Sequence, residues 1–393
     1  TAYEIPLRLV GSDVYKRQGR EQSILRRHPW VFSGAIARFS PDLEDGCWVS
    51  VKDFKGNVLG HGHYQKGSIT VRILDFSAVP TENLYEKRIQ DAWNARLAAG
   101  IITEPTNCFR LVHGEGDQLP GLIIDLYDTV AVIQAHSYGM AADRKILADA
   151  ILDTLGNRIK TIYYKDTLTT EGTYLHGNTS VPLIVSEHGN HFLVDWEHGQ
   201  KTGFFLDQRE NRAMLAQFCR GKNVLNTFCY SGGFSVYALK AGAECVHSVD
   251  SSNHAIDLCV KNVRLNGFDT DIHRCYVSDT FEFLNDPPLD YDVIILDPPA
   301  FAKHKDSRHQ AVRGYQRLNT EAMRSIKSGG IIFTFSCSQV VDRQLFYDTV
   351  MAAAIQSGRV VRVLTHLSQP ADHPVSAFHP EGAYLKGLVL YIE

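Results

Sequence analysis

From Lys201 onward, short apolar runs typical of strands alternate with helical patterns. Seven strands are expected, at Asn223–Phe228, Cys245–Val249, Ile272–Val277, Tyr291–Leu296, Ile331–Phe335, Val360–Leu367 and Gly387–Ile392. Between the first five we expect helices, such as Ser252–Asn266 and Gln310–Ser328, each closed by a glycine. The alternation predicts an α/β fold with a doubly wound, mostly parallel sheet, whose ligand lies at the carboxyl ends of the strands.

Two further segments precede this region. Residues 19–80 contain short β-rich runs separated by turn signals such as Asp45-Gly46, which predicts a small barrel. Residues 81–200 mix both patterns: a helix at Glu82–Ala99, strands at Gly121–Asp125 and Thr129–Ala135, a helix at Ala141–Leu155, a strand at Thr161–Tyr164 and a hairpin over Val181–Trp196. Since 393 residues exceed the usual size of one core, we expect three domains: 19–80, 81–200 (α+β) and 201–393.

The first eighteen residues contain an unusual stretch, Ser12–Gln18. These residues are what a common sequencing-transposon adapter would encode if it were translated. We therefore expect part of the amino terminus to be a library scar and leave residues 1–18 out of the fold prediction.

Composition limits the location and the chemistry. No window approaches about 18 consecutive apolar residues and no basic-then-apolar leader begins the chain, so neither membrane insertion nor secretion is expected. Eight cysteines occur without a C-x-x-C pair, which argues against zinc, an iron–sulfur cluster or a disulfide framework. The expected location is the reducing cytoplasm.

Charge is concentrated in two patches, although the net charge is only −4. One patch, in residues 20–38, holds Arg20, Arg26, Arg27 and Arg38 against Glu21. The other, in residues 297–317, holds Lys303, Lys305, Arg308, Arg313 and Arg317 against Asp297 and Asp306. Each patch is either an ordinary solvated face or a local surface for an anionic ligand.

Polar groups follow the first three strands of the expected sheet. The first turn, Phe228–Ser235, contains Gly232-Gly233, where the backbone can approach a ligand closely. Asp250 follows the second strand, where a carboxylate can accept both hydrogen bonds of a ribose diol, and Asp279 follows the third, placed for an adenine amino group. Each acid could instead be a helix cap. Their order favours a nucleoside-bearing cofactor, and the absence of G-x-G-x-x-G favours S-adenosylmethionine over a dinucleotide.

The fourth and fifth strands end in a carboxylate and a thiol. Asp297 opens an Asp-Pro-Pro turn, and Cys337 follows the next strand forty residues later. Since neighbouring parallel strands end at one crevice, both groups are expected in the same pocket. That pairing suits chemistry on a pyrimidine base.

Most of the chain resembles the RlmI-type ribosomal large-subunit RNA cytosine-C5 methyltransferases. The matching segments are Leu25–Ala35, Lys201–Arg212, the glycine turn, Asp297–Phe301, Arg313–Tyr315, Thr334–Ser338 and Tyr384–Gly387. The resemblance implies an amino-terminal PUA domain, a central α+β domain and a class I, Rossmann-like methyltransferase domain that uses S-adenosylmethionine.

The resemblance also implies which residues bind the cofactor. They are Phe228 and Gly232 at the turn, Asp250 at the ribose, Asp279 at the adenine, Asp297 near the methionine end, and Asp207, Gln208 and Arg209 along the same pocket. Ala300 departs from the lysine or threonine that relatives often carry, which puts the substrate side of that loop in doubt.

The chemistry of cytosine explains why a thiol is needed. Carbon 5 is a poor nucleophile until a thiolate adds at carbon 6 and converts the ring to an enamine. We expect Cys337 to be that nucleophile and Asp297 to stabilise the charge that develops on addition. Cys337 could instead be a buried, inert cysteine, and Cys229, at the cofactor turn, is expected to be structural. No residue is identified as the base that removes the carbon-5 proton.

Contact with RNA is expected at the two basic patches. The candidate residues are Arg26, Arg27, Trp30, Lys303, Lys305 and Arg313, with arginines on phosphates and Trp30 as a stacking surface or, alternatively, a core residue. The target cytosine would have to be unstacked or single-stranded. The oligomeric state is left open between a monomer and a homodimer.

Three other functions remain open. A guanine-N7 methyltransferase would share the Asp-Pro-Pro-x-Phe turn but needs no thiol. A uridine-C5 methyltransferase would use a cysteine, although many carry a cluster-binding cysteine set that is missing here. A noncatalytic RNA-binding assembly factor would have no need of Asp297 and Cys337.

Overall fold

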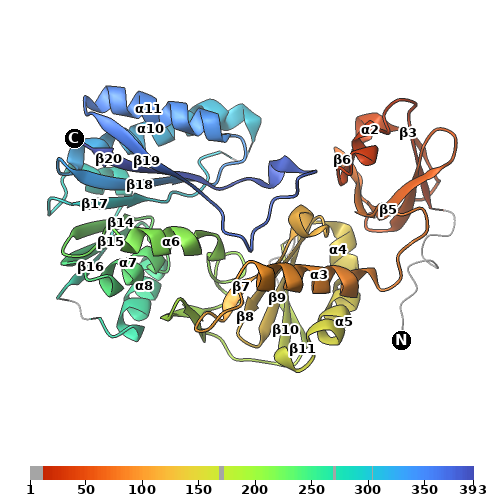
Figure 1. Ribbon diagram of the computed structural model, residues 1–393, viewed down its shortest axis with the longest axis horizontal. Coiled ribbons are helices and arrows are strands. Elements are labelled where there is room, and N and C mark those ends of the chain that lie inside the picture. The colour runs from red at the N-terminus through yellow and green to blue at the C-terminus, as the bar shows by residue number, and fades with distance from the viewer. Residues whose placement is uncertain (1–11, 168–171, 269–270, 303) are drawn as a thin grey trace. The chain divides into compact units, whose positions relative to one another are not determined.

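The computed structural model describes residues 12–167, 172–268, 271–302 and 304–393. It divides into two compact units, each with its own sheets and core (Figure 1). The first unit runs to Leu183 and includes Val194–Phe204 and Ala371–Gly382. The second comprises Ile184–Leu193, Phe205–Pro370 and Ala383–Glu393. The chain therefore passes between the units several times.

The first unit begins with a six-stranded sheet in the order β2-β6-β5-β4-β1-β3. Its elements are β1 (Asp13–Lys16), α2 (Gln22–Leu25), β2 (Trp30–Phe32), η1 (Ser33–Ala35), β3 (Ile36–Phe39), β4 (Trp48–Lys52), β5 (Val58–Tyr64) and β6 (Ile69–Asp75). Valines at positions 14, 31, 49, 51 and 71 are fully buried and form its core. The β-rich prediction for this segment is confirmed.

The strand β1 lies inside the stretch that the sequence interpretation had set aside. It pairs with β3 in antiparallel and with β4 in parallel orientation, so it is an integral strand of the sheet. Val14 and Lys16 point inward, and the Lys16 ammonium donates a hydrogen bond to Ser23 Oγ at 3.2 Å. Burial lowers the pKa of Lys16 to about 8. Leaving residues 13–16 out of the fold prediction was therefore wrong, because these residues pair with two strands and bury Val14 and Lys16.

The rest of the first unit is built on a five-stranded sheet in the order β11-β10-β9-β8-β7. Its elements are α3 (Leu84–Ala98), β7 (Cys108–His113), η2 (Gly114–Asp117), β8 (Leu122–Tyr127), β9 (Val130–Ala135), α4 (Tyr138–Ala142), α5 (Arg144–Leu155), η3 (Gly156–Arg158), β10 (Thr161–Asp166), β11 (Gly172–His176) and, later in the chain, η6 (Pro380–Gly382). The predicted hairpin is present as β12 (Leu183–Glu187) and β13 (Asn190–Val194), most of which belongs to the second unit.

The helix expected at 141–155 is interrupted at Asp143, whose buried carboxylate collects hydrogen bonds from three other elements. Its Oδ2 atom accepts from the Trp48 indole at 2.9 Å and the Tyr85 hydroxyl at 2.7 Å, and lies 3.1 Å from His63 Nε2. Burial alone would raise the pKa of Asp143, but His63 and the two other donors hold it below its usual value. This acid links β4, β5 and α3 to the start of α5.

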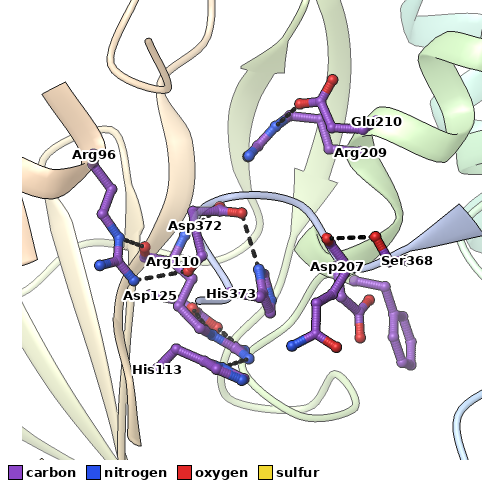
Figure 2. Close-up of polar contacts among 12 residues, drawn as sticks. Arg96, Arg110, His113, Asp125, Asp207, Arg209, Glu210, Ser368, Asp372 and His373 are labelled. Atoms are coloured by element: carbon purple, nitrogen blue, oxygen red, sulfur yellow. Dashed lines mark hydrogen bonds and ion pairs between the residues drawn. The ribbon is translucent and has the colours of Figure 1, made fainter. Parts of the chain in front are cut away.

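The late segment Ala371–Gly382 is held in the first unit by a second polar network (Figure 2). The Asp372 carboxylate accepts the backbone N–H of Arg110 at 3.0 Å, and its carbonyl accepts from Arg96 Nη2 at 2.8 Å. Arg110 in turn makes a bidentate ion pair with fully buried Asp125, at 2.7 and 2.9 Å. His373 Nδ1 lies 2.9 Å from the Asp372 carboxylate.

Replacing Asp143 with alanine is expected to lower the free energy of unfolding by about 3 kcal/mol, because three buried donors lose their acceptor. Urea unfolding followed by tryptophan fluorescence measures the loss. Asp153→Ala, on the exposed face of the same helix α5, is the matched control and should change stability by less than about 0.5 kcal/mol. Equal urea midpoints for the two variants would contradict the role given to Asp143.

The second unit contains a seven-stranded sheet in the order β16-β15-β14-β17-β18-β20-β19. Its strands are β14 (Asn223–Thr227), β15 (Cys245–Asp250), β16 (His273–Val277), β17 (Val293–Leu296), β18 (Gly330–Ser336), β19 (Val361–Ser368) and β20 (Lys386–Ile392). Its helices are η4 (Leu206–Gln208), α6 (Arg209–Ala216), α7 (Gly233–Lys240), α8 (Asn253–Leu265), α9 (Thr280–Asn285), η5 (Lys305–Ser307), α10 (Arg308–Ser325) and α11 (Arg343–Ser357). All seven predicted strands are present.

Strand direction in this sheet determines where a ligand can bind. The pairs β16–β15, β15–β14, β14–β17 and β17–β18 are parallel, whereas β20 lies between β18 and β19 and is antiparallel to both. Helices α9, α10 and α11 pack on one face of the sheet. Figure 1 shows α6, α7 and α8 on the other side of the strands from α10 and α11. The doubly wound prediction is confirmed, and the strand order reverses beside β14, where ligands of such sheets bind.

None of the helices in the described ranges combines the length and the apolar character that crossing a bilayer requires.

Candidate active site

The turn between β14 and α7 has an unusual backbone. Phe228, Tyr230 and Gly232 adopt φ values of +53°, +43° and +73°, in the left-handed region that is costly for residues other than glycine. The turn is stabilised by hydrogen bonds from Cys229 N to Val249 O at 3.1 Å and from Gly232 N to Cys229 O at 2.8 Å. These bonds hold the turn at the carboxyl end of β14.

The two glycines of this turn are required by close packing within the protein. A Cβ atom on Gly232 would lie 2.5 Å from the Cys259 sulfur on α8, and one on Gly233 would lie 3.0 Å from Arg212 Cδ on α6. The sequence interpretation assigned them to close approach of a ligand. The structure adds a second reason, which is that α6 and α8 press directly against the turn.

Asp250 connects the turns after the first two strands. Its carboxylate accepts the Tyr230 N–H at 3.0 Å through Oδ2 and the Ser252 N–H at 3.0 Å through Oδ1. Ser252, rather than Asp250, caps α8, since its hydroxyl accepts from Ala255 N. Each carboxylate oxygen therefore keeps acceptor capacity for a further donor, such as the hydroxyls of a ribose.

Asp279 caps a helix, which was the alternative open for it. Its Oδ1 atom accepts the backbone N–H groups of Phe281 at 2.8 Å and Glu282 at 3.2 Å, at the start of α9. The side chain is exposed at the end of β16. Both bonds use one oxygen, so an adenine contact through the other oxygen stays a prediction.

The predicted residues Asp207, Gln208 and Arg209 lie at the start of α6, and Gln208 reaches Asp297. Gln208 Nε2 donates to Asp297 Oδ1 at 3.0 Å, while its Oε1 accepts from Asn211 Nδ2 at 2.6 Å. The Tyr384 hydroxyl donates to Asp207 Oδ2 at 2.7 Å. Arg209 is buried and donates to Glu210, as Figure 2 shows. Residues far apart in sequence therefore meet beside the end of β17.

Arg212 anchors this arrangement, although no role was predicted for it. Its guanidinium makes a bidentate pair with the fully buried Glu187, at 2.8 and 2.7 Å, and donates to the Phe205 carbonyl at 3.0 Å. Burial alone would lower the pKa of Arg212, but the Glu187 charge and hydrogen bonds raise it. Only its place in the Leu-Asp-Gln-Arg-Glu-Asn-Arg stretch could have drawn attention to it.

Asp297 and Cys337 follow two adjacent parallel strands. Leu296 pairs with Thr334, so Asp297 and Cys337 follow their strands at the same, carboxyl-terminal end of the sheet. Both side chains are half-buried. Both also act electrostatically on the fully buried phenol of Tyr315, whose pKa rises to about 12, chiefly through burial. A common pocket for the carboxylate and the thiol stays a prediction.

Lys386 is a cation near Cys337 that the sequence interpretation left without a role. It is 5% exposed, and its ammonium donates to the Ser338 carbonyl at 2.6 Å and the Tyr384 carbonyl at 2.8 Å. Burial lowers the pKa of Lys386 to about 8, while the charge on Cys337 acts in the opposite direction. A cation beside a cysteine favours the thiolate form.

The candidates for RNA contact lie in both units. Arg26 and Arg27 are exposed after α2, and Arg313 is exposed on α10. Trp30 is half-buried: its indole donates to Glu115 at 2.9 Å, and its ring packs edge-on against His379 at 4.3 Å. Lys303 lies outside the described residues, and of Lys305 only the backbone, in η5, is described.

Comparison with protein families defines the class of this protein. Residues 154–388 match the family described as S-adenosylmethionine-dependent methyltransferase, and residues 17–76 match a PUA-like domain. The first match covers more than half of the chain. The predicted fold class and the predicted cofactor, S-adenosylmethionine, are confirmed.

Curated relatives match over nearly the whole length. Proteins named ribosomal RNA large subunit methyltransferase I from Shewanella amazonensis and Alteromonas mediterranea are 40% and 37% identical, over 95% and 97% of this chain and 97% and 98% of theirs. The same-named protein from Escherichia coli strain SMS-3-5 is 38% identical, over 94% of this chain and 96% of its own. The chain belongs to the ribosomal RNA large subunit methyltransferase I family.

Solved structures share the fold. A Streptococcus mutans protein described as a candidate S-adenosylmethionine-dependent methyltransferase superposes with a TM-score of 0.83 at 22% identity, over 96% of this chain and 99% of its own. A second methyltransferase, complexed with SAH, gives 0.84 at 24% identity with the same coverage.

The residues present fit this cofactor. The half-buried Asp250 carboxylate presents free acceptor positions beside a turn whose backbone is rigid, which matches the diol of a ribose. The roles of the individual residues, Phe228, Gly232, Asp250, Asp279, Asp297, Asp207, Gln208 and Arg209, stay predictions. When bound, S-adenosylmethionine supplies the methyl group.

Asp250→Ala is expected to weaken binding of S-adenosylhomocysteine at least about tenfold, because a charged acceptor for two hydroxyls is lost and the Tyr230 N–H loses its partner. Isothermal titration calorimetry measures the change. Asp257→Ala removes an exposed carboxylate from the neighbouring helix α8 and should leave the Kd unchanged. If the two variants bind equally well, Asp250 does not hold the ribose.

Proposed function

We propose that this protein methylates carbon 5 of a cytosine in large-subunit ribosomal RNA through a covalent adduct with Cys337. The relatives' shared name supports ribosomal RNA of the large subunit as the substrate. The placement of Cys337 and Asp297 at the ends of adjacent parallel strands carries the choice of cytosine carbon 5. The reducing cytoplasm is the corresponding location.

The first step uses the thiolate of Cys337. Its sulfur forms a bond to carbon 6 of the cytosine, and the electron pair of the 5,6 double bond moves into the ring, which makes carbon 5 nucleophilic. The nearby ammonium of Lys386 favours the thiolate before addition. After carbon 5 has received the methyl group, its proton leaves, the double bond re-forms and the thiolate is released.

Asp297 holds the ring during addition. A protonated Asp297 carboxyl that donates a hydrogen bond to the edge of the base orients carbon 6 toward the sulfur and stabilises the negative charge that develops on the ring. Gln208 donates to one oxygen of Asp297 and so fixes the carboxyl plane. Asn211 positions Gln208, through the 2.6 Å bond to its amide oxygen.

Cys337→Ala is expected to lower the rate of methyl transfer to RNA by at least about a thousandfold, because carbon 5 is not activated without the thiolate. Transfer of tritium from labelled S-adenosylmethionine to ribosomal RNA from a deletion strain measures this rate. Affinity for S-adenosylhomocysteine should be unchanged.

Cys245→Ala is the matched control, since this half-exposed thiol starts β15, at the opposite end of a strand of the same sheet. It should retain the full rate. RNA containing 5-fluorocytidine should form an adduct with the wild type, but not with Cys337→Ala, that survives denaturing electrophoresis. Wild-type rates in Cys337→Ala would exclude the mechanism.

Nucleoside mass spectrometry of the product separates the alternative activities. Detection of 5-methylcytidine supports the proposal. Detection of 7-methylguanosine would show a guanine-N7 methyltransferase instead, and detection of 5-methyluridine would show a uridine-C5 methyltransferase. Absence of transfer to any ribosomal substrate, free or in assembly particles, would favour the noncatalytic assembly factor.

We further propose that Arg26, Arg27 and Arg313 contact phosphates, together with Lys303 and Lys305, and that Trp30 offers a stacking surface for a base. Because each phosphate contact releases counterions, each Arg→Ala change should reduce the slope of log K against log salt concentration by about 0.7–0.9. Filter binding at several salt concentrations measures the slope. Lys145→Ala, on the exposed face of α5, makes the same change in charge and should leave the slope unaltered.

A further inference from the structure

Three residues of the second unit place soft metal ligands close together, away from the strand ends where Asp297 and Cys337 lie. Cys259 lies on α8, and His273 and Cys275 lie two residues apart on β16. The Cys259 and Cys275 sulfurs are 3.9 Å apart, and His273 Nε2 lies 3.9 Å from the first and 3.7 Å from the second. These atoms form one compact group of possible ligands.

The spacing is that of ligands around one small ion. In a tetrahedral zinc site, Zn–S bonds of about 2.3 Å and Zn–N bonds of about 2.0–2.1 Å put two sulfurs about 3.8 Å apart and a sulfur and a nitrogen about 3.6 Å apart. The three distances in the structure agree with these values to within a few tenths of an ångström. Thiolate with imidazole is a donor set that zinc prefers.

The cofactor turn places a further thiol near this group. Cys229 acts electrostatically on Cys259, but its sulfur is not part of the compact ligand group of Cys259, His273 and Cys275. Cys259 is fully buried and His273 is 5% exposed, so the group is largely shielded from water.

We propose that Cys259, His273 and Cys275 hold one zinc ion behind the cofactor turn. Zinc binding displaces the thiol protons, so affinity rises with pH.

Neighbouring groups can accommodate the ion. Ser248 Oγ lies 2.8 Å from His273 Nε2 and 2.7 Å from Ser235 Oγ, which accepts from Asn226 at 2.8 Å. When Nε2 binds zinc, the Ser248 hydroxyl can donate to Ser235 Oγ, which lies within hydrogen-bond distance.

The position of the site links it to the cofactor turn. Cys229 follows Phe228 in the strained turn, and the Cys259 sulfur is the atom against which Gly232 packs. An ion held by Cys259, His273 and Cys275 would tie α8 to β16 directly behind the turn. Zinc would then support the turn through its packing against Cys259.

The experiment uses the full-length protein, purified with reductant and without chelator. Metal content by plasma mass spectrometry should give one zinc per chain, and Co²⁺ added to the metal-free protein should give the absorption of tetrahedral thiolate coordination. Cys259→Ser and Cys275→Ser should lose most of the zinc and the absorption. Cys219→Ser, at a buried thiol whose sulfur donates only to the Leu215 carbonyl, should retain both.

Circular dichroism and binding of S-adenosylhomocysteine show whether each variant is folded. The half-buried Cys275 is the variant of choice if Cys259→Ser unfolds. Wild-type protein that takes up neither zinc nor Co²⁺, or variants that bind as much as the wild type, overturn the proposal. A Cys259–Cys275 disulfide found in place of metal also overturns it. None of these outcomes bears on methyl transfer by Cys337, because metal content is measured without RNA.

Discussion

The parallel pairing of β14 with β15 and β17, continued by β17 with β18, is the constraint on which the site depends. The carboxyl ends of parallel strands lie at one end of the sheet. Residues separated by more than a hundred positions therefore come to the same end of the sheet without any local sequence signal. The strained turn at Phe228–Gly232 follows β14 at this end of the sheet. Asp250 links it to the neighbouring strand β15 by accepting the Tyr230 N–H. The position of the cofactor turn and the position of Cys337 are both consequences of the same register.

Much of this architecture could be predicted because apolar periodicity is a local property. The seven strands of the second unit, the turn glycines and the order of Asp250, Asp279 and Asp297 follow from patterns within a few residues. Groups whose partners are distant in sequence could not be found that way. Gln208 with Asp297, Arg212 with Glu187 and Lys386 beside Cys337 each depend on tertiary packing. The capping role of Asp279 was undecided for a related reason, since a cap and a ligand contact use the same residue type.

The cysteines show the limit most clearly. Searching for closely spaced pairs argued against metal, because ligands of small zinc modules recur at short intervals. In a large α/β unit, however, a helix and a neighbouring strand bring Cys259 and Cys275 together across sixteen positions. The amino-terminal strand makes a similar point. Residues 13–16 were set aside because they match a translated sequencing adapter, yet they form an interior strand of a sheet.

The insertion of β20 between β18 and β19 has a consequence for synthesis on the ribosome. Within the described sheet, β19 pairs with β20, which follows it in the sequence. Until Lys386–Ile392 leave the exit tunnel, β18 therefore presents an unsatisfied edge and β19 has no partner in this sheet. The nascent second unit stays an incomplete sheet until these residues emerge, and the strand that completes it begins with Lys386, the cation near Cys337.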